Sequence, residues 1–113
     1  MTELNKVFST GIVLKAAKSF SEKAPAVFTI KVPRANGVKG YDFIPVKAFG
    51  DLKEIAINNL SENVVVYIEG HLQSGSYEKD GRKVYTLDLI ASNIEPAELP
   101  KVEEQEPQRK GWG

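Results

Sequence analysis

The segment from Tyr41 to Phe49 combines aromatic rings and a lysine at alternate positions. A two-residue period places Tyr41, Phe43, Pro45, Lys47 and Phe49 on one face of a strand, and the residues between them on the other. The bases of a single-stranded nucleic acid stack on exposed rings, while an ammonium group neutralises the phosphates. The segment therefore predicts a face that binds a single strand. The alternative is a strand buried on both faces, whose rings belong to the core.

Composition restricts the chemistry that the chain can perform. A length of 113 residues with 42% hydrophobic and 27% charged residues is typical of one ordinary globular domain. The absence of cysteine excludes disulfides and thiolate chemistry, and the single histidine, His71, leaves little material for a zinc site or a His-based catalyst. The spacing of Asp51, Glu69 and Asp88 does not suggest a metal site. We expect no cofactor, no metal and no catalytic residues.

Hydropathy gives no sign of a membrane. The chain has no run of about 18 apolar residues, and its N-terminus lacks a signal-peptide pattern. We therefore expect a cytoplasmic protein without membrane contact.

The charge of the chain is zero in total but uneven along its length. Residues 5–48 hold eight Lys or Arg against two acidic residues, a balance of +6, whereas residues 49–94 have a balance of −3 and the remainder from Glu95 one of −2. A neutral total argues against indiscriminate nucleic-acid binding, yet one surface can still be basic. Individually these cations are ordinary solvated residues, but together they favour a phosphate path. The predicted contacts are Lys6, Lys15, Lys31, Arg34, Lys39 and Lys47, with Lys79, Arg82 and Lys83.

Alternation and turn residues predict the elements in order. Strands are expected over residues 4–14, 26–32, 41–49, 64–72 and 82–91, with loops at 15–25 and 33–40. Gly11 predicts a bulge or sharp bend, and Pro45 predicts a bulged or unpaired position. The dipeptide Asp80–Gly81 predicts a hairpin between the last two strands.

One helix is expected, directly after the aromatic segment. Asp51 is a candidate N-cap, and Glu54 would complete a capping box. Leu52, Ile55, Ala56 and Leu60 form its apolar stripe. In the strand that follows, the expected core face holds Val64, Val66, Ile68 and Leu72.

Five strands with a helix between the third and fourth are the arrangement of the OB-fold, an all-β, five-stranded Greek-key barrel. This fold binds oligonucleotides and oligosaccharides across strands 2 and 3 and the adjacent loops, so the aromatic face lies where the fold binds its ligands. The expected domain covers residues 1–95. Residues 96–113, with three prolines and five acidic residues from Glu95 onward, predict a flexible tail.

The same segments resemble the bacterial and phage single-stranded DNA-binding protein family. The resemblance covers residues 4–95, and its most specific parts are DFIPVKAFG from Asp42, VYIEGHL from Val66 and YEKDGRKVY from Tyr77. It implies that Phe43, Phe49 and Tyr77 stack on bases and that Tyr67 lies near the same path. Tyr67 and Tyr85 belong either to the ligand path or to a subunit interface. The family often has one more ring after strand 2, where this chain has Arg34-Ala35-Asn36.

The end of the chain departs from the family pattern. Family tails usually finish with acidic residues and a phenylalanine that partner enzymes recognise, whereas this chain ends QRKGWG from Gln108. Trp112 would then be the partner-binding residue, although Arg109 and Lys110 have the opposite charge. Such a tail fits a phage or mobile-element version of the protein.

The resemblance implies a protein that binds single-stranded DNA without sequence preference in replication, recombination or repair. It also implies a homotetramer, assembled through outward faces such as those of strands 1 and 4, and a tail that contacts replication or recombination proteins. The alternative is an OB-fold protein-interaction subunit, of a primosome or mobile-element complex, with reduced DNA binding. An enzyme is the weakest interpretation, because no nucleophile–base pair or phosphate loop can be assembled from these residues.

Overall fold

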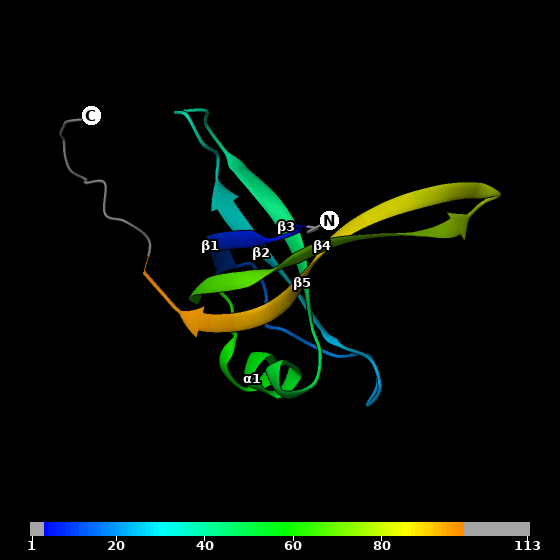
Figure 1. Ribbon diagram of the computed structural model, residues 1–113, viewed down its shortest axis with the longest axis horizontal. Coiled ribbons are helices and arrows are strands. Elements are labelled where there is room, and N and C mark those ends of the chain that lie inside the picture. The colour runs from blue at the N-terminus through cyan, green and yellow to red at the C-terminus, as the bar shows by residue number, and fades with distance from the viewer. Residues whose placement is uncertain (1–3, 99–113) are drawn as a thin grey trace.

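Five strands and one helix make up residues 4–98, the part of the chain that the computed structural model describes (Figure 1). The elements are β1 (Val7–Val13), β2 (Ala26–Pro33), β3 (Tyr41–Ala48), α1 (Asp51–Asn59), β4 (Val65–Lys79) and β5 (Arg82–Pro96). The strands close into a barrel in the order β1-β2-β3-β5-β4. The predicted order of elements, and with it the OB-fold, is confirmed.

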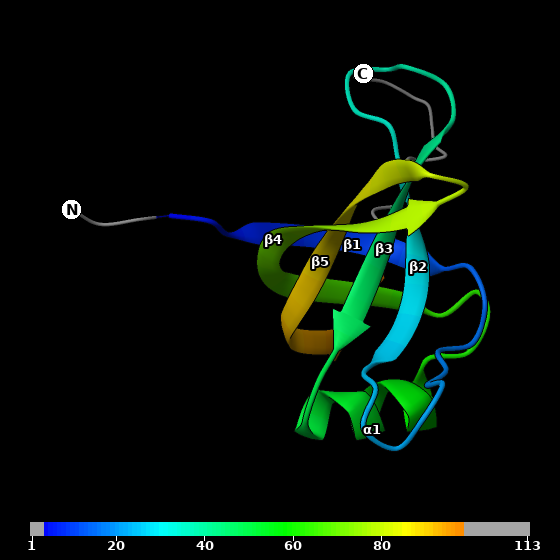
Figure 2. The ribbon, with the colours of Figure 1, turned by 90° about the vertical axis from the view of Figure 1, so that its right-hand side faces the viewer.

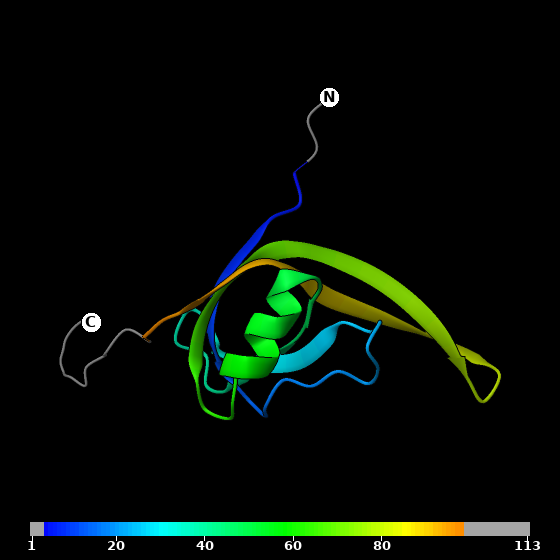
Figure 3. The same ribbon diagram turned by 90° about the horizontal axis from the view of Figure 1, so that it is seen from below.

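Alternate residues of every strand fill the interior. The largest fully buried side chains are Ile30, Ile68, Leu89, Val13, Val46 and Val66. Helix α1 lies across one end of the barrel, as seen from below in Figure 3. It buries Ala56, and Leu60 just beyond its end is also buried.

The start of α1 differs from the prediction. Gly50 is the N-cap, with φ 61°, and no side chain caps the helix; Asp51 is its first residue. Only glycine adopts this conformation easily, which allows the chain to turn sharply from β3 into the helix. The predicted capping box is therefore wrong, although Asp51 and Glu54 still lie in the first turn, where the helix dipole favours acidic groups. The apolar stripe is confirmed except at Ile55, which is exposed.

Strands β4 and β5 form a hairpin that is longer than predicted and projects beyond the barrel (Figure 1). Asp80 and Gly81 turn with φ of 54° and 77°, as a two-residue hairpin turn with two positive φ angles requires. Leu72 lies on the inner side, because it pairs with buried Leu89, but it is exposed since β4 leaves the barrel there. The prediction of Leu72 as a core residue is therefore wrong.

One bulge interrupts the β4–β5 ladder. Glu69 pairs with Asn93 and Gly70 pairs with Ala91, so Ser92 is the extra residue. The bulge changes the alternation of β5, which allows Ile94 and Leu89 both to be buried. At Gly11, where a bulge or sharp bend was predicted, and at Pro45, where a bulged or unpaired position was predicted, the ladders run in register and no bulge forms.

The neighbours of Gly11 and Pro45 in the sheet explain why these residue types occur there. A side chain at Gly11 would meet Ile30 and the carbonyl of Lys31 at 3.1 Å, so this glycine permits a close approach of β1 to β2. Pro45 pairs with Thr29, whose carbonyl accepts a bond from Leu14 on β1. The Thr29–Pro45 pair is thus one that exchanges no bonds, and the missing N–H of Pro45 removes none from the β2–β3 ladder.

In residues 4–98, no helix is long and apolar enough to cross a membrane. The residues predicted to matter at the end of the chain, Arg109, Lys110 and Trp112, lie outside the described residues, as does most of the predicted tail. The predicted domain limits stay a prediction.

Candidate nucleic-acid interface

The outward side chains of β2 and β3 form one continuous surface, which we call the β2–β3 face. It consists of the cross-strand pairs Pro33–Tyr41, Lys31–Phe43, Thr29–Pro45 and Val27–Lys47. Figure 2 shows the two strands side by side, with α1 below them. Directly opposed residues point to the same side of a sheet, so rings, cations and small side chains share this face.

The rings of β3 lie on the surface, as the two-residue period predicts. Phe43 is 59% exposed and Phe49, just after the strand, is 50% exposed, whereas Val46 and Ala48 between them are buried. The alternative that these two phenylalanines belong to the core is therefore wrong. Tyr41 is also exposed, and its ring lies 4.9 Å from the ammonium of Lys31. Cation and ring thus occupy neighbouring positions on the β2–β3 face.

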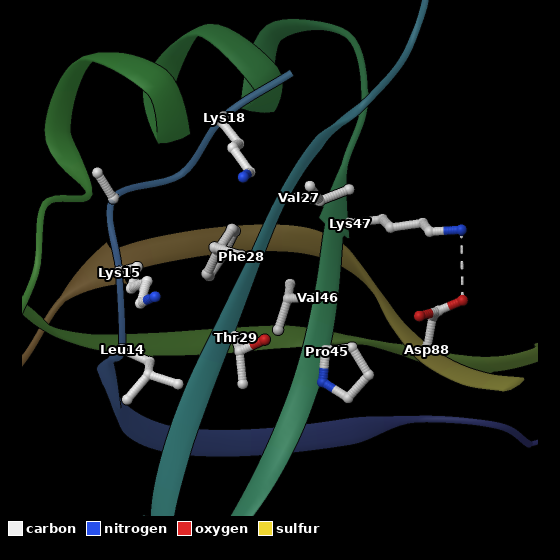
Figure 4. Close-up of a pocket in the computed structure, with 11 residues that line it drawn as sticks. Leu14, Lys15, Lys18, Val27, Phe28, Thr29, Pro45, Val46, Lys47 and Asp88 are labelled. Carbon is white, nitrogen blue, oxygen red and sulfur yellow. Dashed lines mark ion pairs between the residues drawn. The ribbon is translucent and has the colours of Figure 1, made fainter. Parts of the chain in front are cut away.

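A groove of about 270 Å³ lies against the β2–β3 face (Figure 4). Thr29, Val27 and Pro45 lie along its floor, and Lys15 and Lys18, from the loop after β1, lie on the β2 side. Lys47 and Asp88 lie on the β3 side. The groove therefore has an apolar floor between lysines on its two sides, an arrangement suited to a chain that alternates flat bases and anionic phosphates.

Two of the predicted cations already have acidic partners. Lys47 Nζ lies 3.3 Å from Asp88 Oδ2, and the Asp88 side chain is only 16% exposed. Arg34 Nε donates a bond of 3.1 Å to Asp42 Oδ1 beside the β2–β3 loop. Lys15, Lys31 and Lys39 appear in no ion pair among residues 4–98. The positive charge of the face consequently comes from the loop after β1 and from β2 more than from Lys47.

The hairpin places its aromatic and basic residues on two different sides. Ile90 pairs with Lys47, and alternation along β5 brings Val84, the partner of Tyr77, to the same side of the sheet. The pair Lys79–Arg82 follows the same alternation. Tyr77 is exposed, so this side continues the β2–β3 face outward along the hairpin. Lys83 and Tyr85 point to the opposite side.

Tyr67 lies on the outer surface of β4, between Thr10 of β1 and Glu95 of β5. Its hydroxyl donates a bond of 2.8 Å to Glu69 Oε2, and this bond, with partial burial and the nearby carboxylates, raises the pKa of Tyr67 above its ordinary value. Both neighbours of β4 in the barrel are strands other than β2 and β3. The structure thus separates Tyr67 from the β2–β3 face, as it does Lys6, which precedes β1.

Four residues that contribute to this region were not predicted as site residues: Lys18, Phe20, Lys53 and Asp88. Lys18 and Phe20 lie in the loop expected at residues 15–25, where a single ring among polar residues was an available signal. Asp88 and Lys53 could not be identified from the sequence pattern, because the residues that they contact, Lys47 and the loop after β1, are distant in the sequence. In residues 4–98, no group of His, Cys, Asp or Glu is placed to hold a metal ion.

Comparison with known proteins gives matches over almost the whole described chain. Residues 4–97 match the model of the single-strand binding protein family. Single-stranded DNA-binding protein 1 of Streptococcus pyogenes serotype M6 is 28% identical over 98 residues, which cover 80% of this chain and 75% of that protein. Single-stranded DNA-binding protein 2 of Streptococcus agalactiae serotype V is 30% identical with the same coverage.

A solved structure shares the fold. The SSB of Plasmodium falciparum, in complex with ssDNA, superposes with a TM-score of 0.73 over 87% of this chain and 98% of that one. The sequence identity is 16%, so this likeness concerns the arrangement of strands and helix.

Proposed function

Because the chain belongs to the single-strand binding protein family, we propose that it binds single-stranded DNA along the β2–β3 face with little sequence preference. The observation that carries the proposal is the outward row of rings on β3 beside the lysines of the groove. Every base has a flat face, so stacking on Phe43 and Phe49 tolerates any sequence. Lys15, Lys18 and Lys31 neutralise the phosphates between them.

The same geometry explains a preference for single strands. Bases in a duplex are stacked on each other and offer no free face to a protein ring, whereas unpaired bases do. A bound strand cannot reanneal and is protected from nucleases. Replication, recombination and repair need this protection. The role is binding rather than catalysis, and its place is the cytoplasm, where melted DNA arises.

Titration of labelled oligo-dT, followed by fluorescence anisotropy, tests the proposal against a duplex of equal length. Tight binding of oligo-dT and weak binding of the duplex are expected. Equal affinity for the two forms would contradict the proposal, because phosphate attraction alone does not distinguish them.

The protein is further proposed to form a homotetramer through the outer faces of β1 and β4. Support comes from Phe8, which is exposed on the outer face of β1 opposite Glu69 and close to Tyr67. Light scattering after gel filtration measures the mass directly, and Phe8→Glu is the variant that should dissociate subunits. A monomeric wild-type protein would contradict this part of the proposal.

The end of the chain is proposed to contact replication or recombination proteins through Trp112. The test is a pull-down with and without the last five residues. Equal recovery of partners by both forms would contradict it.

A second function, a protein-interaction subunit with reduced DNA binding, is favoured by one observation. Lys47 and Arg34, two of the predicted phosphate contacts, are paired with Asp88 and Asp42. A protein that binds oligo-dT no better than duplex, yet retains its fold, would fit this second function.

A further inference from the structure

The loop between β1 and β2 presents an aromatic ring to solvent. Phe20 is 75% exposed, although its neighbours Ser19 and Ser21 are small and polar. A ring with this exposure contributes little to the core, since most of its surface stays in water. Packing in the barrel interior therefore does not explain why this position holds a phenylalanine.

Lys18 connects this ring to the groove. The Lys18 ammonium lies 5.3 Å from the centroid of the Phe20 ring, and the same side chain lines the groove against the β2–β3 face. Figure 4 shows Lys18 on the β2 side of the groove, near α1. Lys18 thus lies between Phe20 and the groove proposed to bind the DNA. The pair of ring and cation repeats the arrangement of Tyr41 and Lys31.

The far end of β3 meets the same loop. Phe49 lines a hollow together with residues 22–25 of the loop and with Lys53 of α1. A strand that passes Phe43, crosses the groove and reaches Phe49 therefore arrives beside the loop that carries Phe20.

Several hydrogen bonds attach the loop to β2 and α1. Lys18 and Val27 exchange backbone bonds of 3.1 and 2.7 Å, which fasten its base to β2. Ser19 Oγ donates to the carbonyls of Ser21 and Ala24. Lys53 Nζ, from α1, donates to the carbonyls of Ser21 and Glu22 at 3.2 and 2.6 Å. A ring on such a fixed loop loses little conformational entropy when it stacks on a base.

We propose that Phe20 is a further base-stacking site for single-stranded DNA, at the end of the strand path beyond the groove. Lys53 is its positioning residue, because it binds the carbonyls of Ser21 and Glu22, the two residues that follow Phe20. The inference rests on the proposed function and extends it to a residue outside the β2–β3 face. The ligand here is an unpaired nucleotide of a strand already bound to that face.

The test compares affinities for an oligo-dT of about 20 nucleotides, longer than the roughly 4–16 nucleotides that one OB-fold covers. Phe20→Ala should weaken binding about 5- to 150-fold, the range for loss of one stacked base. Phe20→Tyr, which keeps the ring, should stay within about twofold of the wild type, by the same reasoning. Ile57→Ala, an exposed apolar residue of α1, is the matched control and should bind as the wild type does.

Lys53→Met tests the positioning role. It should weaken binding in the wild-type background and have a smaller effect in the Phe20→Ala background, since the two residues then act through the same contact. Equal effects in both backgrounds would overturn this role.

The stacking site would be overturned if Phe20→Ala bound as well as the wild type, if Phe20→Tyr lost as much affinity as Phe20→Ala, or if Phe20→Ala lowered the thermal midpoint markedly. Failure of the wild type itself to bind oligo-dT would instead contradict the proposed function. The two failures are therefore distinguishable.

Discussion

The position of each phenylalanine within its strand decides what it can do. Phe28 of β2 is 6% exposed and belongs to the core. Phe43 of β3, which pairs with Lys31 of β2, points outward. The difference arises from parity, because successive side chains of a strand point to opposite faces. Phe28 therefore contributes to stability, while Phe43 leaves its ring free for a ligand.

Substitution of the two kinds of ring should separate binding from stability. Phe43→Ala and Phe49→Ala should each cost about 1–3 kcal/mol of DNA binding, with little loss of thermal stability because about half of each ring is already exposed. Phe28→Ala, the control, should cost about 3–5 kcal/mol of folding free energy. Thermal midpoints and oligo-dT titrations measure both quantities. Unfolding of the Phe43 or Phe49 variants, with normal binding by the folded fraction, would contradict the assignment.

The ion pair between Lys47 and Asp88 should limit affinity. Asp88→Asn frees the Lys47 ammonium for phosphate, so binding should strengthen and the slope of log affinity against log salt should steepen by up to about 0.7, the single-strand value per charge. Lys47→Ala alone should weaken binding, because it leaves the Asp88 carboxylate of the groove without its partner, and this charge then repels phosphate.

The double variant Lys47→Ala with Asp88→Asn is the control for that effect. It should bind more tightly than Lys47→Ala, since the unpaired carboxylate is gone. Titrations of the four proteins at several salt concentrations give both affinity and slope. Identical slopes for the wild type and Asp88→Asn would show that Lys47 does not contact phosphate.

Among the elements, the β4–β5 hairpin depends on one close approach of its two backbones. A Cβ atom at Gly70 would overlap the Ile90 carbonyl oxygen, and a backbone atom cannot rotate away as a side chain can. The bulge at Ser92, next to this contact, sets the register of β4 and β5 there. The hairpin that carries Tyr77 is therefore aligned by Gly70, although Gly70 itself is buried and is not one of the proposed DNA contacts.

Gly70→Ala should destabilise the fold by about 3 kcal/mol or more, at the upper end of overpacking costs. Gly75→Ala, in the same strand, is the matched control: its new methyl would meet only the Thr86 hydroxyl at 3.1 Å, and that side chain can turn. Chemical denaturation measures both variants. Equal stability of the two proteins would show that the β4–β5 crossing relaxes easily.

For the whole molecule, a net charge of zero coexists with a basic surface. The acidic balance from Glu95 onward, −2, offsets part of the +6 of residues 5–48. Long-range attraction of DNA thus depends on how charge is distributed rather than on the total.

Truncation after Glu98 should leave DNA affinity unchanged, because the residues that it removes include three acidic and three basic side chains. Anisotropy titrations of full-length and truncated protein measure this. A large loss of affinity on truncation would show that Arg109, Lys110 or Trp112 contacts DNA.

The sequence by itself determined the features that depend on near neighbours along the chain. The alternation in residues 41–49 put Phe43 and Phe49 outside and Val46 inside, because the side-chain period of a strand is two whatever the fold. Asp80–Gly81 predicted the hairpin, since both turn residues need positive φ. The order of strands and helix then selected the OB-fold.

Only the tertiary structure decided the features that join distant segments. The Lys47–Asp88 pair, the Lys53 bonds to the loop after β1, and the bulge at Ser92 all depend on which strands or loops lie side by side. Local pattern cannot supply such contacts, since their partners are brought together by closure of the barrel and not by spacing along the chain.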